Sequence, residues 1–235
     1  MKNINDFIKK MKKIKDKGFI KTHRIGNTGI GKTLEDLLGI TENNVPIANT
    51  TFAELKSARK GSKSMLTLFT KAPLPQKANS VLLNEFGYKT PKSDNKKILH
   101  TTAKATEYNT LKGKKGFKIN TVNDKLILCS SEGKELGYWD EVTLKNSFGK
   151  KLHHVLYVRA EYRGKGENEE FWFNEAWLLS GFNFKGFKNN VNYGVICIDI
   201  RIGQYPNGTP HDHGTGFRVH PDKLNLCFDQ RKQLI

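Results

Sequence analysis

Residues 49–59 read Asn-Thr-Thr-Phe-Ala-Glu-Leu-Lys-Ser-Ala-Arg, a short polar turn followed by a segment typical of a β-strand. Strand residues two apart point to the same face, so we expect Glu54 and Lys56 side by side, with Leu55 turned into the core. This pair suits phosphodiester hydrolysis. The carboxylate can hold a divalent ion that polarises the phosphate, while the ammonium positions water or stabilises developing charge.

The Glu-x-Lys triplet alone is weak evidence. The chain is rich in lysine and contains comparable pairs at Lys165–Glu167 and Glu132–Lys134. An exposed strand with alternating charges would show the same pattern. The sequence around the triplet is more specific.

Two further motifs precede the triplet. Gly26–Ile40 reads Gly-Asn-Thr-Gly-Ile-Gly-Lys-Thr-Leu-Glu-Asp-Leu-Leu-Gly-Ile, and Glu42–Pro46 reads Glu-Asn-Asn-Val-Pro. With Glu54-Leu-Lys-Ser57, this ordered series resembles the MvaI/BcnI group of type II restriction endonucleases. These enzymes are relatives of the mismatch-repair nicking enzyme MutH among the PD-(D/E)xK nucleases. The resemblance extends from about Phe19 to Arg218.

The resemblance implies an α/β chain with the PD-(D/E)xK restriction-endonuclease-like fold, a mixed central sheet flanked by helices and two lobes around a DNA cleft. We expect residues 1–90 to form mainly the catalytic lobe. Residues 91–235 would form mainly the DNA-recognition lobe, with strands that complete the core of one continuous structural unit. The implied reaction is Mg²⁺-dependent hydrolysis of duplex DNA at a short CC(N)GG-like site, leaving 5′-phosphates.

The resemblance also implies a set of active-site residues. Glu54 and Lys56 are joined by Asn49 and by Glu35, a supporting acid, and Mg²⁺ is expected at Asn49, Glu54 and the carbonyl of Leu55. The family pattern has an aspartate where this chain has Asn49, and hard cations bind mainly through anionic oxygens. We therefore expect weakened metal affinity and low activity unless a neighbouring acid compensates. Natural divergence and deliberate inactivation both stay open as explanations.

A second informative block lies near the C-terminus. A strand from Gly194 to Ile200 leads to Asp199 and Arg201, which alternation places on one face, and a flexible loop over 203–210 follows. Arginine binds guanine O6 and N7 through two hydrogen bonds, and histidine can donate to the same acceptors. By resemblance, the base-reading set comprises Asp199, Arg201, His211, His213 and Arg218. A zinc site at His211 and His213 would need two more ligands.

Basic segments supply further candidate DNA contacts. Arg59 and Lys60 open the run Arg59–Ser64, which is suited to following a phosphate backbone. Lysines also interleave with glycine and Phe117 between residues 112 and 118. A DNA contact and a solvated charged edge would both give this second pattern.

The composition favours a polyanionic partner. The 235 residues include 40 Lys+Arg and 23 Asp+Glu, which gives a net charge of +17. We expect double-stranded DNA as the partner rather than a membrane, since no apolar run approaches about 18 residues and no signal-peptide pattern is seen. Cys129, Cys197 and Cys227 form no disulfide or zinc pattern, which indicates a reducing cytoplasm, and the resemblance implies a bacterial one. By resemblance, we expect a monomer with a companion DNA methyltransferase.

Gly26–Thr33 also matches the phosphate-binding loop Gly-x-x-x-x-Gly-Lys-Thr of nucleotide hydrolases. Such a loop needs a buried apolar strand directly before it, but Ile20–Arg24 is polar. Val195–Asp199 could imitate the second acidic strand, yet it lies far along the chain. We prefer a glycine turn that opens a helix over Lys32–Leu38, closed by Gly39.

Other elements follow from local patterns. We expect an amphipathic helix over 4–14, a strand over 45–47, a strand over 65–70 that resumes the sheet of residues 52–58, a helix over 80–86, a hairpin of strands 117–122 and 125–130, a short helix over 139–148 and a buried strand over 154–161. Besides a restriction endonuclease and a nucleotide hydrolase, two functions stay open. One is a MutH-like mismatch-repair nicking enzyme, and the other is a catalytically silent, sequence-specific DNA-binding protein.

Overall fold

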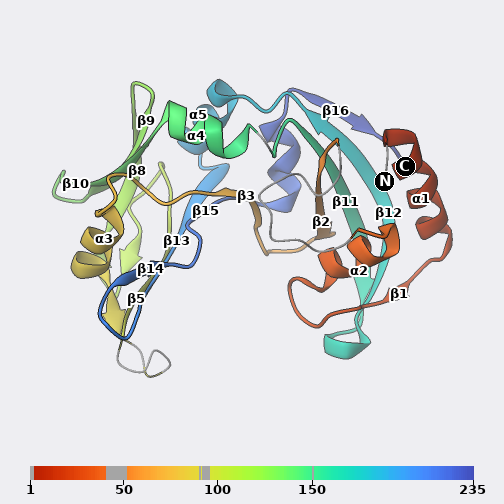
Figure 1. Cartoon of the computed structure of the whole chain (residues 1–235), viewed down its shortest axis with the longest axis horizontal. Coiled ribbons are helices and arrows are strands. Elements are labelled where there is room, and N and C mark those ends of the chain that lie inside the picture. The colour runs from red at the N-terminus through yellow and green to blue at the C-terminus, as the bar shows by residue number, and fades with distance from the viewer. Residues whose placement is uncertain (1–2, 41–51, 90, 92–95, 150) are drawn as a thin grey trace. The chain divides into compact units, whose positions relative to one another are not determined.

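The computed structural model describes residues 3–40, 52–89, 91, 96–149 and 151–235 (Figure 1). The chain forms two compact units. The first unit comprises Met1–Leu66, Gly149–Asn183 and His220–Ile235, and the second comprises Thr67–Phe148 and Phe184–Val219. Because each unit is assembled from separated segments, this division differs from the one expected at residue 90.

In the described part of the chain, the first unit is built on a five-stranded mixed sheet. Its strand order is β1 (Ile20–Lys21), β12 (Glu170–Ser180), β11 (His154–Arg163) and β2 (Glu54–Arg59), with β16 (Gln230–Gln233) also paired to β12. β2 runs parallel to β11, whereas β11, β1 and β16 each run antiparallel to β12. The mixed α/β architecture is therefore confirmed.

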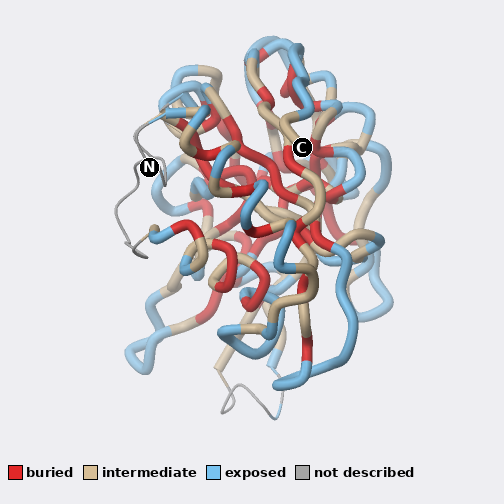
Figure 2. Tube along the Cα trace, turned by 90° about the vertical axis from the view of Figure 1, so that its right-hand side faces the viewer, coloured by how far each residue is buried: buried red, intermediate tan, exposed pale blue. Residues whose placement is uncertain are grey.

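Two helices cover one face of this sheet. Asn3 caps the N-terminus of α1 (Ile4–Asp16), because its side chain accepts a hydrogen bond from the backbone N–H of Asp6 at 3.0 Å. α2 (Gly29–Leu38) starts three residues before the expected position and ends at Gly39, which has a φ of 70° that favours glycine. The apolar stripes of both helices pack against alternate residues of β2, β11 and β12 to form the core of this unit. Figure 2 traces the buried residues along the chain.

Arg59, at the end of β2, forms a buried ion pair. Its Nε lies 2.6 Å from Oε1 of Glu169, and a terminal nitrogen lies 2.7 Å from Oε2. The guanidinium also donates to the carbonyl of Gly26 at 3.0 Å and lies 5.1 Å from the ring centre of Phe171. These contacts tie β2 to the turn before α2 and to the start of β12.

The described residues of the second unit form a six-stranded sheet. Its order is β3 (Leu66–Thr70), β15 (Gly216–Val219), β13 (Ile196–Gln204), β5 (Lys97–Ala103) and β4 (Tyr88–Lys89), with β14 (Pro210–Asp212) paired to β13. β3 therefore does not resume the sheet that contains β2. Its neighbour β15 is about 150 residues further along the chain, a pairing that local sequence patterns do not reveal.

Smaller sheets and helices complete the second unit. β8 (Phe117–Val122), β9 (Lys125–Ser130) and β10 (Glu135–Asp140) form an antiparallel sheet, while β6 (Thr110–Leu111) and β7 (Lys114–Lys115) form a hairpin. The helices are α3 (Ala78–Phe86), α4 (Glu141–Phe148) and α5 (Phe184–Asn192). The hairpin expected around residues 123–124 is confirmed at the same strand boundaries.

The core of the second unit is aromatic. The rings of Phe69 and Phe217 stack with centres 4.5 Å apart, and Phe187 and Trp139 lie against Phe217 at 5.6 and 5.4 Å. The expectation of a helix starting at Trp139 is wrong, because Trp139 belongs to β10 and the helix starts at Glu141. The indole N–H of Trp139 donates to the carbonyl of Lys71 at 3.0 Å, which fixes this buried ring.

The Arg59–Glu169 pair yields a stability prediction. Glu169→Ala would leave a largely buried guanidinium without its counter-ion and should lower the free energy of unfolding by about 3 kcal/mol. The exposed neighbour Glu167 is the matched control, and Glu167→Ala should change stability by less than about 0.5 kcal/mol. Urea unfolding followed by circular dichroism measures both values. Equal midpoints for the two variants would contradict the prediction.

Candidate active site

Glu54 and Lys56 lie together on one face of β2. The Nζ of Lys56 is 3.5 Å from Oε1 of Glu54, and each side chain is only 10% exposed. Leu55, between them, points the other way and is buried in the core with α1 and α2. The strand alternation read from the sequence therefore gives the correct geometry for this pair.

The pair is electrostatically unusual because it is buried. Burial lowers the pKa of Lys56 below its usual value of 10.5, and the attraction of Glu54 only partly opposes this shift. On Glu54, Oε2 is buried and accepts no hydrogen bond from any residue that the structure describes. A buried carboxylate oxygen without a partner is destabilising, and a hard cation is a ligand that would satisfy it.

The ligands for such a cation are only partly described. Among the described residues, no group of three or more His, Cys, Asp or Glu side chains is arranged to hold a metal. Glu54 supplies the carboxylate, and the carbonyl of Leu55 belongs to the same strand. Asn49 and the strand expected over residues 45–47 lie outside the described residues. Glu54 thus fits a metal site whose other side-chain ligand would be Asn49.

Glu35 lies on α2. That helix packs through Ile30, Leu34 and Leu38 against the face of β2 that carries Leu55. Lys56 is on the face of β2 opposite to Leu55. Glu35 is next to Leu34 on α2 and is half-buried. The supporting role of Glu35 stays a prediction.

Tyr157 is a neighbour of the pair that the sequence analysis missed. It is aligned with Lys56 in the parallel register of β11 and β2, and residues so aligned share a face of the sheet. Its hydroxyl donates to the carbonyl of Pro221 at 3.1 Å, and burial raises the pKa of Tyr157. Only the register between distant strands reveals this residue.

Charged side chains surround this row of residues. Arg159 pairs with Asp222 at 2.8 Å and Glu175 at 3.4 Å, while Lys60 Nζ lies 3.2 Å from Glu175. Arg59 and Lys60, which were expected along a phosphate backbone, thus both form ion pairs within the first unit. Their DNA-binding role stays a prediction.

In the second unit, Asp199 holds two of the expected base-reading arginines. Oδ2 of Asp199 lies 2.8 Å from Nε of Arg201 and 3.1 Å from Nε of Arg218. The Arg201 contact is a hydrogen bond, whereas the Arg218 contact is an ion pair without hydrogen-bond alignment. Asp199 is 7% exposed and Arg201 has a 46% exposed side chain, so the acid is buried beneath an accessible guanidinium.

Histidines gather beside these arginines. The rings of His211 and His213 have centres 4.5 Å apart, and His100 on β5 lies 6.3 Å from His213. His100, which the sequence analysis missed, is aligned with Arg201 across β13 and β5. Burial, followed by the charges of Arg201 and His213, lowers the pKa of His100.

The connection between β13 and β14 is tighter than expected. The sequence indicates a loop from residue 203 to 210, but β13 continues to Gln204 and β14 begins at Pro210. Gly203 pairs with His211, and the side chain of Gln204 donates to the carbonyl of Gly208 at 2.9 Å. His211 is thereby placed in a regular antiparallel hairpin.

The phosphate-binding-loop interpretation lacks its required strand. A loop of that kind follows a buried strand, but Gly26 is preceded by β1, which has two residues and pairs with β12 at the edge of the described sheet. The first of these residues is half-buried and the second is exposed.

Among the described residues, no helix is both long and apolar enough to span a membrane.

Comparisons with known proteins identify the class. Among solved structures, restriction endonuclease MvaI in complex with its cognate DNA substrate matches at 31% identity over 98% of each chain, with a TM-score of 0.83. MvaI in the absence of DNA matches at 31% identity over 100% of each chain, with a TM-score of 0.64. No curated protein sequence matches the chain. The fold is that of a restriction endonuclease, and the protein is a site-specific deoxyribonuclease.

The family is defined more narrowly by a sequence comparison. The model of the MvaI/BcnI restriction endonuclease family matches residues 8–228. The chain therefore belongs to this family and is a type II restriction endonuclease. This confirms the resemblance inferred from the motifs around Gly26–Ile40 and Glu54.

The lowered pKa of Lys56 gives a pH-dependent stability prediction. The folded protein binds the Lys56 proton more weakly than the unfolded chain does, so the buried ammonium destabilises the fold at neutral pH. This penalty is relieved as pH rises towards 10.5, the usual pKa of lysine. The free energy of unfolding of the wild type minus that of Lys56→Met should therefore increase between about pH 7 and pH 10.

Urea unfolding curves at several pH values measure this difference. The subtraction removes the contribution of groups that titrate identically in both proteins. A difference that stays constant or falls as pH rises would mean that the Lys56 ammonium is well solvated in the folded protein.

Proposed function

We propose that this restriction endonuclease hydrolyses duplex DNA in a Mg²⁺-dependent reaction at a short CC(N)GG-like site, leaving 5′-phosphates. The observation that carries the proposal is the buried Glu54–Lys56 pair with its unpaired carboxylate oxygen. The structural relative MvaI is described in complex with a cognate DNA substrate, which supports duplex DNA as the partner. The net charge of +17 suits the same polyanion.

Each residue of the proposed active site has a separate role in the reaction. Glu54, the carbonyl of Leu55 and Asn49 would hold Mg²⁺, with Glu35 in support, and the bound ion would polarise the scissile phosphate. The Lys56 side chain is largely shielded from water, and in such a setting its ammonium interacts strongly with a charged oxygen. It orients the attacking water or stabilises charge that develops on the phosphate. The 3′ oxygen leaves and is protonated.

Base reading falls to the second unit. Asp199 accepts a hydrogen bond from Nε of Arg201 and forms an ion pair with Arg218, which leaves the terminal N–H donors of both guanidinium groups for guanine O6 and N7. His211 and His213 add donors to the same set of contacts. In this proposal one copy of the chain carries both the catalytic and the base-reading residues, so the protein acts as a monomer. A companion DNA methyltransferase would protect the same site in the host.

Asn49 keeps a second function open. A neutral amide at the position of a metal-binding aspartate weakens the affinity for Mg²⁺. The protein would then bind its site without cutting it, as a catalytically silent DNA-binding protein. A MutH-like nicking enzyme would instead cut one strand, and the group of arginines and histidines around Asp199 favours the restriction endonuclease over it.

Asn49→Asp should raise Mg²⁺-dependent cleavage of plasmid DNA. A second anionic ligand increases the affinity for a hard cation, so the variant should also reach half-maximal activity at lower Mg²⁺. Plasmid digestion across a Mg²⁺ titration, with run-off sequencing of the cut ends, measures activity and target together. Unchanged cleavage at every Mg²⁺ concentration would remove Asn49 from the metal site. Nicked circles as the final product would favour the MutH-like alternative.

Lys56→Ala and Arg218→Ala should separate catalysis from base reading. Lys56→Ala should lower the cleavage rate at least about 100-fold while leaving the Kd for DNA unchanged. Arg218→Ala should weaken discrimination at one base pair by about 1–3 kcal/mol. Single-turnover cleavage and binding, measured on the target and on duplexes with one changed base pair, distinguish the two effects. Reversed outcomes would mean that the two roles are assigned to the wrong residues.

A further inference from the structure

The β6–β7 hairpin concentrates positive charge on the second unit. Between residues 104 and 118 the chain contains five lysines and a single acid, Glu107. Glu107 lies 2.9 Å from the Nζ of Lys104. Among the described residues, the other four lysines form no ion pair with an acid; they are Lys112, Lys114, Lys115 and Lys118. The positive charges of these lysines repel one another unless an anion binds next to them.

The backbone of the hairpin is firmly held. The side-chain amide of Asn109 donates to the hydroxyl of Thr101 at 3.1 Å and to the carbonyl of Thr102 at 3.3 Å, while its oxygen accepts the N–H of Phe117 at 2.9 Å. The turn at Lys112 and Gly113 has φ values of 49° and 79°, as in a tight two-residue hairpin turn. The lysines at its tip therefore project from a fixed support.

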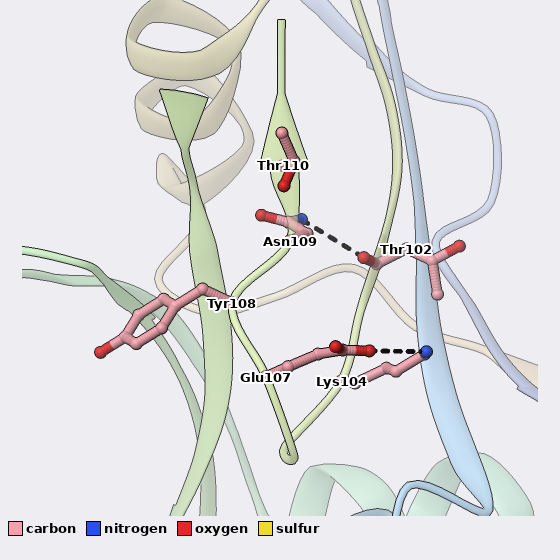
Figure 3. A pocket seen from close by; sticks show the side chains of 6 residues that line it. All are labelled: Thr102, Lys104, Glu107, Tyr108, Asn109 and Thr110. Atoms are coloured by element: carbon pink, nitrogen blue, oxygen red, sulfur yellow. Dashed lines mark hydrogen bonds and ion pairs between the residues drawn. The ribbon is translucent and has the colours of Figure 1, made fainter. Parts of the chain in front are cut away.

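A pocket of about 310 Å³ opens at the base of the hairpin. Figure 3 shows two hydrogen bonds between residues that line this pocket. The ammonium of Lys104 donates to the carboxylate of Glu107, and the side-chain amide of Asn109 donates to the backbone carbonyl of Thr102. Its lining is largely polar, consisting of Thr102, Lys104, Glu107, Tyr108, Asn109 and Thr110. The base of the hairpin is thus a polar surface next to the lysines.

Aromatic rings position several of these lysines. The ammonium groups of Lys115 and Lys118 lie 4.6 and 5.1 Å from the ring centre of Tyr108. Lys112 lies 5.0 Å from the ring centre of Tyr88. Cation–π contacts restrict the lysine side chains without neutralising their charge. The hairpin therefore presents preorganised positive charges, which reduces the entropy lost when an anion binds.

Contacts within the second unit connect the hairpin to the base-reading residues. Lys112 lies over Tyr88, whose hydroxyl donates to the carbonyl of His100 at 3.4 Å. The ring of His100 lies 6.3 Å from that of His213. DNA carries one phosphate per about 3.4 Å of each strand, so a duplex read at His213 brings many phosphates to its flanks.

We propose that the β6–β7 hairpin binds backbone phosphates of the DNA that flanks the target sequence. This inference rests on the proposed function, since it assumes that the arginines and histidines around Asp199 read bases. Lys112, Lys114 and Lys115 each contact phosphate, while Tyr88 and Tyr108 hold the side chains of Lys112 and Lys115 in place. The contact does not depend on base sequence, so it strengthens binding and fixes the register of the protein on the duplex.

The test compares two triple variants with the same change of charge. One variant combines Lys112→Gln, Lys114→Gln and Lys115→Gln. The control combines Lys9→Gln, Lys12→Gln and Lys13→Gln, three exposed lysines on α1. Circular dichroism confirms that both are folded. Each is titrated, without Mg²⁺ and at several salt concentrations, with a duplex trimmed to the target and with one extended on both sides.

On the extended duplex, the hairpin variant should bind more weakly, and its plot of log Kd against log salt should be shallower by up to about 0.9 for each phosphate that the hairpin no longer neutralises. On the trimmed duplex it should match the wild type, and the α1 variant should keep the wild-type slope on both. Equal weakening by the two variants, or a wild-type slope for the hairpin variant, would overturn the inference. If the inference is overturned in this way but the wild type still cuts DNA at a fixed site, the proposed function is not affected. An inactive wild type and an inactive Asn49→Asp variant would overturn the proposed function instead.

Discussion

The parallel pairing of β2 with β11 places ionisable groups where water is scarce. Glu54 and Lys56 leave one face of β2 while Leu55 anchors the other face in the core beneath α1 and α2. Burial destabilises the Lys56 ammonium, and the attraction of Glu54 only partly compensates, so the pKa of Lys56 is lowered. Among the described residues, Oε2 of Glu54 has no hydrogen-bond partner. A fold tolerates such local destabilisation mainly where function requires it.

The two units use charge in contrasting ways. In the first unit, arginines and lysines next to β2 are neutralised by buried or half-buried acids, as in the pairs Arg59–Glu169 and Lys60–Glu175. In the second unit, the buried acid Asp199 pairs with two arginines, and Lys112 and Lys115 of the β6–β7 hairpin lie over aromatic rings. The basic side chains beside β2 are therefore neutralised by acids of the same unit, whereas Lys112, Lys114 and Lys115 of the hairpin are exposed.

Local sequence patterns predicted much of this structure. The spacing of Phe7, Met11 and Ile14 predicted α1, and the alternation around Leu55 predicted that Glu54 and Lys56 lie side by side on one face of β2. Residues that depend on pairing between distant strands were missed. Tyr157 and His100 owe their positions to the registers of β11 with β2 and of β5 with β13, and no short stretch of sequence encodes a register. The assignment of β3 to the wrong sheet has the same cause.

The shared carboxylate of Asp199 has an evolutionary consequence. Arg201 and Arg218 come from different strands but depend on one oxygen atom, so any replacement of either arginine also changes the electrostatic setting of the other. Under the proposed base-reading role, a new specificity at one position of the target would disturb the reading of a second position. Descendants of this chain should change target preference by coordinated replacements at several of these sites rather than by single steps.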